Sequence, residues 1–174
     1  MTWNSFHRRG QVLQTVLETA DTRRDGVLPM QLPGVAETFR GELDLLAALQ
    51  LKWHTRLSGH IERELVSQPL DLQGAVEAAW RNAADELPGV RRILDHYRAH
   101  PTDEAMATAM AKATAKEHVL LAVMAGQASV DDASAAPFGA RIEANARRER
   151  VPVSAEGIDE QPSLLERLKA VVAA

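Results

Sequence analysis

Histidines and the carboxylates near them are the side chains in this sequence best suited to chemistry. The chain has six histidines and no cysteine, so imidazole and carboxylate groups are its candidate metal ligands and its candidate acids and bases. His60 and Glu64 are four residues apart, as are His96 and His100, so each pair shares one face if its segment is helical. His118 lies farther along, in an alanine-rich stretch typical of a helix.

The order of these residues resembles the ligand order of the hemerythrin-like family, in which four helices enclose two non-haem irons. The resemblance implies an iron protein that handles oxygen, a reactive oxygen species or iron. The other interpretation is that these are ordinary surface or partly buried histidines and that the chain holds no cofactor. The shared pattern is a His-x-x-x-Glu pair, a His-x-x-x-His pair and a later histidine, which are His60, Glu64, His96, His100 and His118 here.

Glu117 is the acidic residue with the most unusual surroundings. It falls on an apolar stripe of its predicted helix, together with Met106, Met110 and Leu121. A carboxylate buried among apolar side chains needs a partner or a raised pKa. We therefore expect Glu117 to form a salt bridge with an arginine or lysine at the margin of that stripe.

Sequence motifs that mark common enzyme sites are missing from the chain. It contains no P-loop, no Gly-x-Gly-x-x-Gly, no Gly-x-Ser-x-Gly and no His-Glu-x-x-His. The absence of cysteine also removes a thiolate nucleophile, disulfides and zinc ribbons. These observations favour a protein that is not an enzyme.

Charge and hydropathy exclude further classes of function. Acidic residues outnumber basic ones by 24 to 20, for a net charge of −4. This balance gives no support for nucleic acid as a partner, because that binding depends on neutralising phosphates. The longest uninterrupted apolar run, Val119 to Ala125, is far shorter than the roughly 20 residues that span a bilayer. No signal-peptide core follows Arg8 and Arg9, so we expect a cytoplasmic protein that does not contact a membrane.

Helical periodicity dominates the rest of the chain. The longest regular stretch, from Gly34 to Gln68, repeats large apolar residues at helical spacings and predicts one central helix. If the protein has a buried site, we expect it beside the second half of this helix, where His54, His60 and Glu64 flank the apolar residues. Those apolar residues are Val35, Phe39, Leu43, Leu46, Trp53, Leu57, Ile61 and Leu65.

Capping residues and prolines bound the other predicted helices. Asp71 and Thr102 are suitable N-caps, Pro88 fits the first turn of a helix, and Gly126 marks a C-terminal end. Together these patterns predict an all-α protein, an antiparallel bundle of about four main helices with an N-terminal helix and a C-terminal accessory amphipathic helix. We expect a single helical-bundle domain over residues 1–150, a linker over 151–161 and the accessory helix over 162–174.

The C-terminal accessory helix is the strongest indication of a contact surface. Ser163 and Glu166 form a capping box, and a helix of about 12 residues is marginal alone in water. It must therefore pack against its own bundle, a second copy of the chain or a groove on a partner protein. We predict a non-enzymatic helical module that acts through protein–protein contacts, as a homo-oligomer or with another protein. The expected contact residues are Leu164, Leu165, Leu168 and Val172.

Two further regions have alternative interpretations. A basic run near residue 150, diluted by Glu143 and Glu149, favours a solvated charged face over a binding patch. Alanine-rich helices near Trp53 and Trp80 would either enclose a small apolar ligand or pack into a solid core. The arginines of the basic run are Arg141, Arg147, Arg148 and Arg150.

Overall fold

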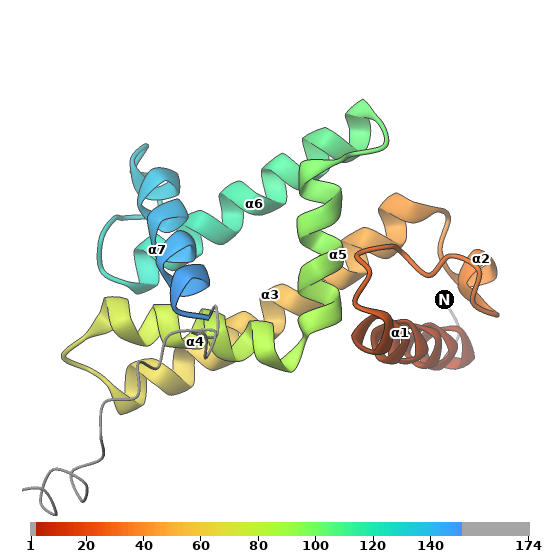
Figure 1. Cartoon of the computed structure of the whole chain (residues 1–174), viewed down its shortest axis with the longest axis horizontal. Helices are drawn as coiled ribbons and strands as arrows, with labels where there is room; N and C mark the ends of the chain where they lie inside the picture. The colour runs from red at the N-terminus through yellow and green to blue at the C-terminus, as the bar shows by residue number, and fades with distance from the viewer. Residues whose placement is uncertain (1–2, 151–174) are drawn as a thin grey trace, which may run out of the picture.

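The computed structural model describes residues 3–150, with side chains described from His7 onward. Within these residues all regular structure is helical, in seven helices and without a strand, so the predicted all-α helical bundle is confirmed (Figure 1). The helices are α1 (Trp3–Arg23), α2 (Val35–Thr38), α3 (Glu42–Ser67), α4 (Leu72–Glu86), α5 (Pro88–Ala99), α6 (Glu104–Met124) and α7 (Ala135–Arg150).

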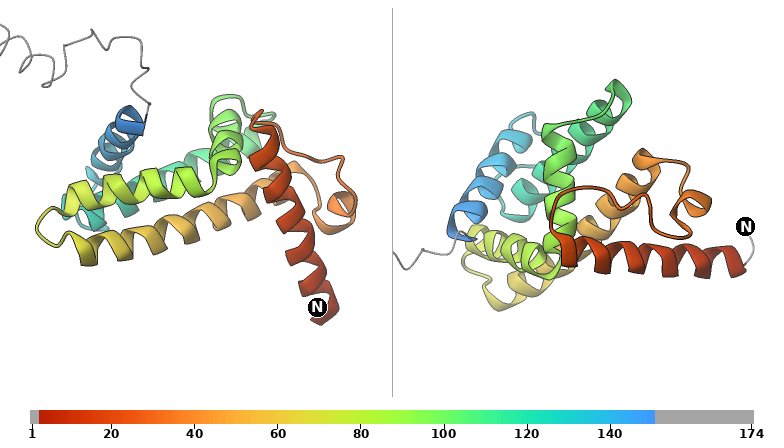
Figure 2. Two further views of the ribbon diagram at one scale, coloured as in Figure 1. Left: turned by 60° about the horizontal axis from the view of Figure 1, so that its bottom comes forward. Right: turned by 45° about the vertical axis from the view of Figure 1, so that its right-hand side comes forward.

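The helices pack as consecutive pairs joined by one crossing helix. α3 and α4 lie side by side in opposite directions, and α6 and α7 form the second closely packed pair. α7 also packs against α4, which joins the two pairs, and α5 stands across the α3–α4 pair (Figures 1 and 2). α1 packs against α5 on the outer side. The middle of the bundle is therefore bounded by α4, α5, α6 and α7.

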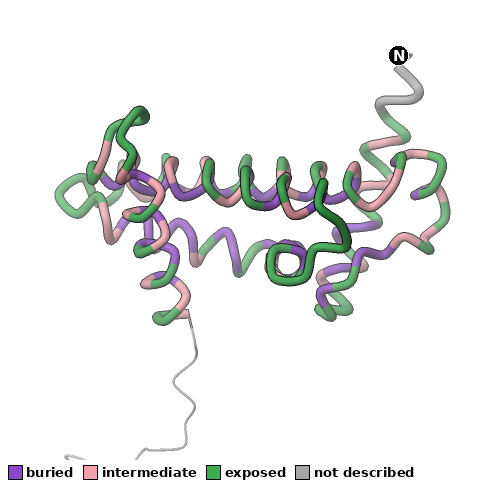
Figure 3. The backbone as a smooth tube through the Cα atoms, turned by 90° about the horizontal axis from the view of Figure 1, so that it is seen from above, coloured by how far each residue is buried: buried purple, intermediate pink, exposed green. Residues whose placement is uncertain are grey.

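Two tryptophans form the centre of the core. Trp53 of α3 and Trp80 of α4 are fully buried and meet edge to face, with ring centroids 5.7 Å apart and planes inclined by 72°. This geometry is favoured by the quadrupoles of aromatic rings. Figure 3 shows buried and exposed residues alternating along the helices, as expected for helices with one side against a core. The burial of both indoles favours the packed-core interpretation of this region.

The single central helix predicted from Gly34 to Gln68 is wrong. α2 ends at Thr38 and α3 begins at Glu42, with an extended residue between them. Phe39 has φ −116° and ψ 132°, which no helix can contain. Its side chain is buried in the core, so the turn away from helical geometry is compensated by burial of an aromatic ring.

Because α3 begins at Glu42, the leucines that it buries differ from those that the sequence predicts. Asp44 accepts a hydrogen bond from the backbone N–H of Arg40 at 3.2 Å, which fixes the chain as it enters the helix. From this start Leu45 and Leu49 face the core, whereas Leu43 is exposed. The predicted burial of Leu43 is therefore wrong, because it requires one continuous helix, whereas α2 ends at Thr38.

Most of the predicted helix ends are confirmed. Asp71 caps α4, Pro88 begins α5, and Gly126 ends α6 with the positive φ that glycine tolerates. The predicted cap at Thr102 is wrong by one residue. Asp103 caps α6 instead, since its Oδ1 accepts the N–H of Met106 at 2.7 Å and its charge lies at the positive end of the helix dipole.

Two glycines allow backbones to touch where larger residues would hold them apart. A Cβ added to Gly139 of α7 would lie 1.8 Å from the carbonyl oxygen of His118 on α6. A Cβ added to Gly89 of α5 would lie 2.2 Å from the carbonyl oxygen of Ala20 on α1. These approaches set the spacing of α6, α7, α5 and α1, and hence the positions of the side chains between them.

Two further predictions concern membrane contact and the C-terminal segment of the chain. Among the described helices none combines the length and hydropathy needed to cross a membrane. The predicted linker over residues 151–161 and the helix over 162–174 lie outside the described residues. The predicted contact residues on that helix are Leu164, Leu165, Leu168 and Val172.

Candidate functional site

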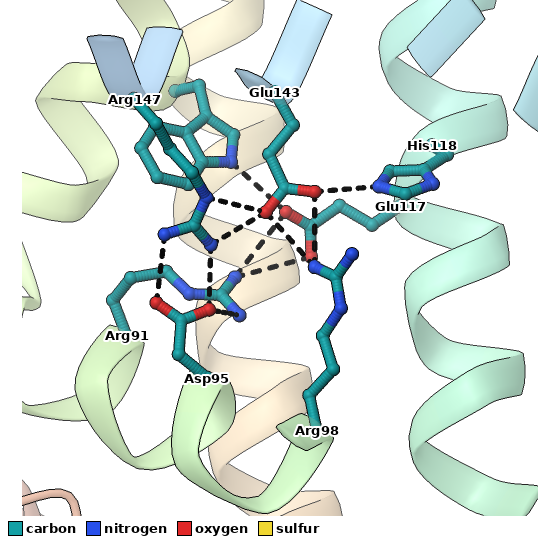
Figure 4. A network of polar contacts seen from close by, with 8 residues as sticks. Arg91, Asp95, Arg98, Glu117, His118, Glu143 and Arg147 are labelled. Atoms are coloured by element: carbon teal, nitrogen blue, oxygen red, sulfur yellow. Dashed lines mark hydrogen bonds and ion pairs between the residues drawn. The ribbon is translucent and has the colours of Figure 1, made fainter. Parts of the chain in front are cut away.

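Charged and ionisable side chains from α5, α6 and α7 meet inside the bundle (Figure 4). We call this group the buried charge cluster. Four of its members, Arg91, Glu117, His118 and Glu143, are at most 8% exposed. Burial of a charge is costly unless the charge is paired and hydrogen-bonded, so the partners of each member decide what the cluster does. Its members are Arg91, Asp95, Arg98, Glu117, His118, Glu143 and Arg147.

One half of the cluster surrounds Glu117. The indole N–H of Trp80 donates to Oε1 of Glu117 at 3.1 Å, and Nη1 of Arg91 lies 3.5 Å from both carboxylate oxygens. The guanidinium of Arg91 also stacks on Trp53, with Cζ 4.7 Å from the ring centroid, and pairs with Asp95 at 2.9 Å. The prediction that Glu117 has a basic partner is confirmed.

The other half surrounds Glu143. Its Oε2 lies 2.6 Å from Nε2 of His118, and its Oε1 accepts hydrogen bonds from Nε and Nη2 of Arg147 at 2.9 and 2.7 Å. Nη1 of Arg98 lies 3.1 and 3.2 Å from the two carboxylate oxygens. Arg147 also donates to both oxygens of Asp95, at 2.9 and 2.7 Å. Arg147 thus connects the two halves.

The charges of the cluster balance. Burial on its own would raise the pKa of Glu143, but the hydrogen bond with His118 and the charges of Arg147 and Arg98 hold it well below its ordinary value of 4.5. Burial would lower the pKa of Arg147, but its bonds to Asp95 and Glu143 raise it. Three arginines face three carboxylates, so the cluster is neutral when His118 is neutral. Each carboxylate is held by at least one arginine, an arrangement suited to holding helices together.

Glu143→Gln is expected to make the free energy of unfolding less dependent on pH in the acidic range. Because the pKa of Glu143 is lower in the folded protein, its charge stabilises the fold fully above its ordinary value of 4.5, and that contribution is lost as the pH falls below it. The free energy of unfolding of the parent protein should therefore fall more steeply than that of the variant between about pH 5 and about pH 3.

Urea denaturation at a series of pH values measures this slope. Glu62→Gln, which replaces an exposed carboxylate of α3, controls for the loss of one carboxylate from the chain. Equal slopes in the parent protein and Glu143→Gln would show that Glu143 gains no stabilisation from its partners.

The first predicted ligand pair, His60 and Glu64, faces α4 from the side of the bundle. Nε2 of His60 lies 2.8 Å from Oε2 of Glu86, and its Nδ1 lies 2.9 Å from a nitrogen of Arg63. Glu64 accepts a hydrogen bond from Asn82 at 2.9 Å. Both members of the pair are only half-buried. His60 and Glu64 are therefore not among the buried ionisable side chains, which lie on α4 to α7 within the described residues.

The remaining predicted ligands lie in two other places. His96 and His100 are exposed on α5 and at its end, with ring centroids 5.3 Å apart. His118 lies in the buried charge cluster, bonded to Glu143. Within residues 7–150 no three histidine or carboxylate side chains are arranged to hold a metal ion. The geometry therefore gives no support to the resemblance to hemerythrin-like proteins.

The charge pattern of the sequence does not distinguish the cluster from an ordinary helix surface. Arg91 and Asp95, and likewise Glu143 and Arg147, are opposite charges four residues apart, a pattern typical of solvated helix surfaces. The solvated face predicted for the basic run is wrong for Arg147, which belongs to the cluster. Arg150 is partly exposed and bonds a carboxylate and a carbonyl group of α4 at 2.8 Å. One feature of the sequence does indicate a buried charge, because Arg91 lies beside Val90, Ile93 and Leu94 on the apolar face of its helix.

Comparison with known proteins assigns no family to the chain. No family model matches it, and neither a curated protein nor a solved structure matches it significantly. Its function must therefore be inferred from its own residues.

Proposed function

We propose that this protein is a non-catalytic helical module that acts through contacts with polypeptide chains, and that it associates with a second copy of itself. The observation that carries the proposal is a set of exposed apolar side chains, here called the apolar end. Leu70 is fully exposed, Val66 is 83% and Val130 70% exposed, and Leu72 is also exposed. Single exposed apolar residues are ordinary, whereas several at one end of a molecule mark a contact surface.

The four residues belong to neighbouring loops and helix ends. Val66 is in the last turn of α3, Leu70 is in the α3–α4 turn and Leu72 begins α4. The side chain of Leu72 lies against Gly126, 3.3 Å from where a Cβ of that glycine would be, and Val130 follows in the α6–α7 loop. Both connections lie at the same end of the bundle in Figures 1 and 2.

The C-terminal segment of a second copy is the proposed occupant of the apolar end. Its sequence places Leu164, Leu165, Leu168 and Val172 on one face, as expected for a segment that docks on an apolar surface. The charges are complementary as well. Asp71, Asp131 and Asp132 are exposed around the apolar end, and the segment carries two basic residues, Arg167 and Lys169, against one acidic residue, Glu166.

The position where α7 ends favours a second copy over the same chain. Arg150, the last residue of α7, bonds Ala84 and Asp85 near the C-terminal end of α4. The apolar end lies at the opposite end of α4, which is 15 residues or about 22 Å away. The same chain would have to run back along the whole of α4, whereas a neighbouring copy can present the segment directly.

The buried charge cluster supports a non-catalytic role. Its carboxylates are all engaged by arginines, and a general acid or nucleophile needs a group that reaches a substrate. Paired charges of this kind hold α5, α6 and α7 in register. The stable scaffold then presents the apolar end, which is what a contact module requires.

Replacing Val66 and Leu70 together with Asp is expected to convert an associating protein into a monomer, because two carboxylates in an apolar contact would lose water without gaining partners. Light scattering after size-exclusion chromatography measures the molar mass. The parent protein is expected to approach twice the mass of the 19.0 kDa chain as its concentration rises.

Leu51→Asp is the matched control, because Leu51 is 67% exposed on α3 but lies away from the apolar end. Its molar mass should equal that of the parent protein. A parent protein that is monomeric at every concentration, or a double variant with the parent's mass, would contradict the proposal.

A further inference from the structure

A pocket with a volume of about 600 Å³ lies between the turn after α1, one face of α5 and the C-terminal part of α7. This volume is in the range of small-molecule sites. Basic side chains dominate the lining, which has five arginines and two histidines against two aspartates. Because the whole chain has a net charge of −4, such a local excess of basic residues points to a site for an anion. The five arginines are Arg24, Arg91, Arg92, Arg147 and Arg150.

Three of these arginines already have carboxylate partners. Arg91 and Arg147 both pair with Asp95, at 2.9 and 2.7 Å, and each also has a glutamate partner in the buried charge cluster. Arg150 pairs with Asp85 of α4 at 2.8 Å. The charges of these three arginines are therefore balanced within the protein, and they do not require a ligand.

Arg24 and Arg92 have no carboxylate partner among the described residues. Nε of Arg24 donates to a backbone carbonyl of α1 at 2.9 Å, and the exposed side chain of Arg92 makes no hydrogen bond or ion pair to any residue described. Asp25 also lines the pocket, but its own turn engages it. Its carboxylate accepts hydrogen bonds from Nε of Arg23 at 2.8 Å and from the N–H of Val27 at 3.0 Å. The pocket therefore has two arginines available to an anion.

Arg24 occupies a backbone conformation that normally selects glycine. Its φ of 48° is in the left-handed region, which is unfavourable for a residue with a Cβ. It directly follows the end of α1, where glycine is the usual residue in this conformation. The turn itself therefore does not explain an arginine at this position, whereas a role for its side chain in binding does.

The turn that carries Arg24 is packed against α5. A Cβ added to Gly26 would lie 3.2 Å from Cβ of His96 and 3.4 Å from the carbonyl oxygen of Arg92. Figure 1 shows the chain after α1 running alongside α5. The two available arginines thus belong to elements in contact and line the same pocket, so one ligand can pair with both.

We propose that this pocket binds a small phosphorylated molecule, whose phosphate group pairs with Arg24 and Arg92. A phosphate monoester carries a charge of about −1.5 to −2 at pH 7 and has three acceptor oxygens, which suits two guanidinium groups. Arginine is well matched to phosphate because its planar N–H donors bind two oxygens at once. A monocarboxylate has one charge and would leave one arginine unpaired. The rest of the molecule occupies the part of the pocket lined by His96, Ala99 and His100.

Isothermal titration calorimetry of the full chain with ribose 5-phosphate and AMP tests the proposal, with ribose and adenosine as matched probes without phosphate. We expect saturable binding of one phosphorylated probe per chain. Each probe without phosphate should bind at least about tenfold more weakly, as for loss of a charge-assisted hydrogen bond. AMP that binds more tightly than ribose 5-phosphate would identify a nucleotide site, and AMP that binds no more tightly would identify a sugar-phosphate site. Adenosine that binds as tightly as AMP, or no binding of either phosphorylated probe, would overturn the proposal.

Three variants locate the binding in this pocket. Arg92→Gln should weaken AMP binding by about tenfold. Arg24→Gly should weaken it similarly and leave thermal unfolding unchanged, because glycine favours the backbone conformation at that position. Arg8→Gln, which removes an exposed arginine of α1 outside the lining, should leave AMP affinity unchanged. Unchanged affinity in Arg92→Gln or in Arg24→Gly would overturn the assignment. The pocket shares no residue with the apolar end, so these titrations test a property separate from self-association.

Discussion

Replacing Arg91 with methionine is expected to lower the free energy of unfolding by about 3–5 kcal/mol, the usual cost of removing one partner from a buried ion pair. The guanidinium of Arg91 faces Glu117, is stacked on Trp53 and pairs with Asp95. Without it, Glu117 keeps only the hydrogen bond from Trp80 among the contacts described above. A carboxylate that is 5% exposed then has no positive partner. Urea denaturation monitored by circular dichroism measures the change.

Two further variants separate the charge effect from simple loss of a side chain. Arg92→Met, at the neighbouring exposed position of α5, should change stability by no more than about 0.5 kcal/mol. Arg91→Met combined with Glu117→Leu should recover much of the loss, because no unpaired buried charge remains at Glu117. A loss below about 1 kcal/mol for Arg91→Met would contradict the pairing described here, because breaking a buried pair costs several times more.

Gly139→Ala is expected to lower the free energy of unfolding by about 3 kcal/mol, at the upper end of the usual cost of overpacking. The added Cβ would lie 1.8 Å from the carbonyl oxygen of His118 and 2.4 Å from its carbonyl carbon. Backbone atoms cannot rotate out of the way, so α6 and α7 must separate. That separation would also lengthen the contact between His118 and Glu143.

The control for this substitution is another glycine within a helix. Gly59 lies in the middle of α3, and a Cβ there would meet only the end of the Arg63 side chain, at 3.6 Å. Gly59→Ala should therefore stabilise the protein by up to about 1 kcal/mol, the difference in helix propensity. If Gly139→Ala is as stable as the parent protein in thermal and urea denaturation, the close approach of α6 and α7 is wrong.

The helical architecture could be predicted from the sequence because it depends on local patterns. Helical spacing of apolar residues identified the segments, and residues such as Asp71, Pro88 and Gly126 marked their ends through well-understood backbone preferences. The sequence also predicts that Glu117 has a basic partner, since a buried carboxylate on an apolar face must be paired. None of this requires knowledge of which helices are neighbours.

The buried charge cluster could not be predicted because its pairs connect helices that are distant in the sequence. Glu143 and Arg98 are 45 residues apart, and Asp95 and Arg147 are 52 apart. Opposite charges four residues apart on one helix have the same spacing whether they face solvent or another helix. The break at Phe39 cannot be predicted for a similar reason, because the spacing of its apolar neighbours fits a continuous helix equally well. In each case tertiary packing decided between two locally acceptable structures.

Mixing two defective variants is the most direct test of the proposed self-association. One variant carries Asp at Val66 and Leu70, so its apolar end is damaged but its C-terminal segment is intact. The other carries Asp at Leu165 and Leu168, so its segment is damaged but its apolar end is intact. If the segment of one copy docks on the apolar end of another, each variant alone should be monomeric by sedimentation velocity, and an equimolar mixture should form dimers. A mixture that stays monomeric, or either variant forming dimers alone, would contradict that docking.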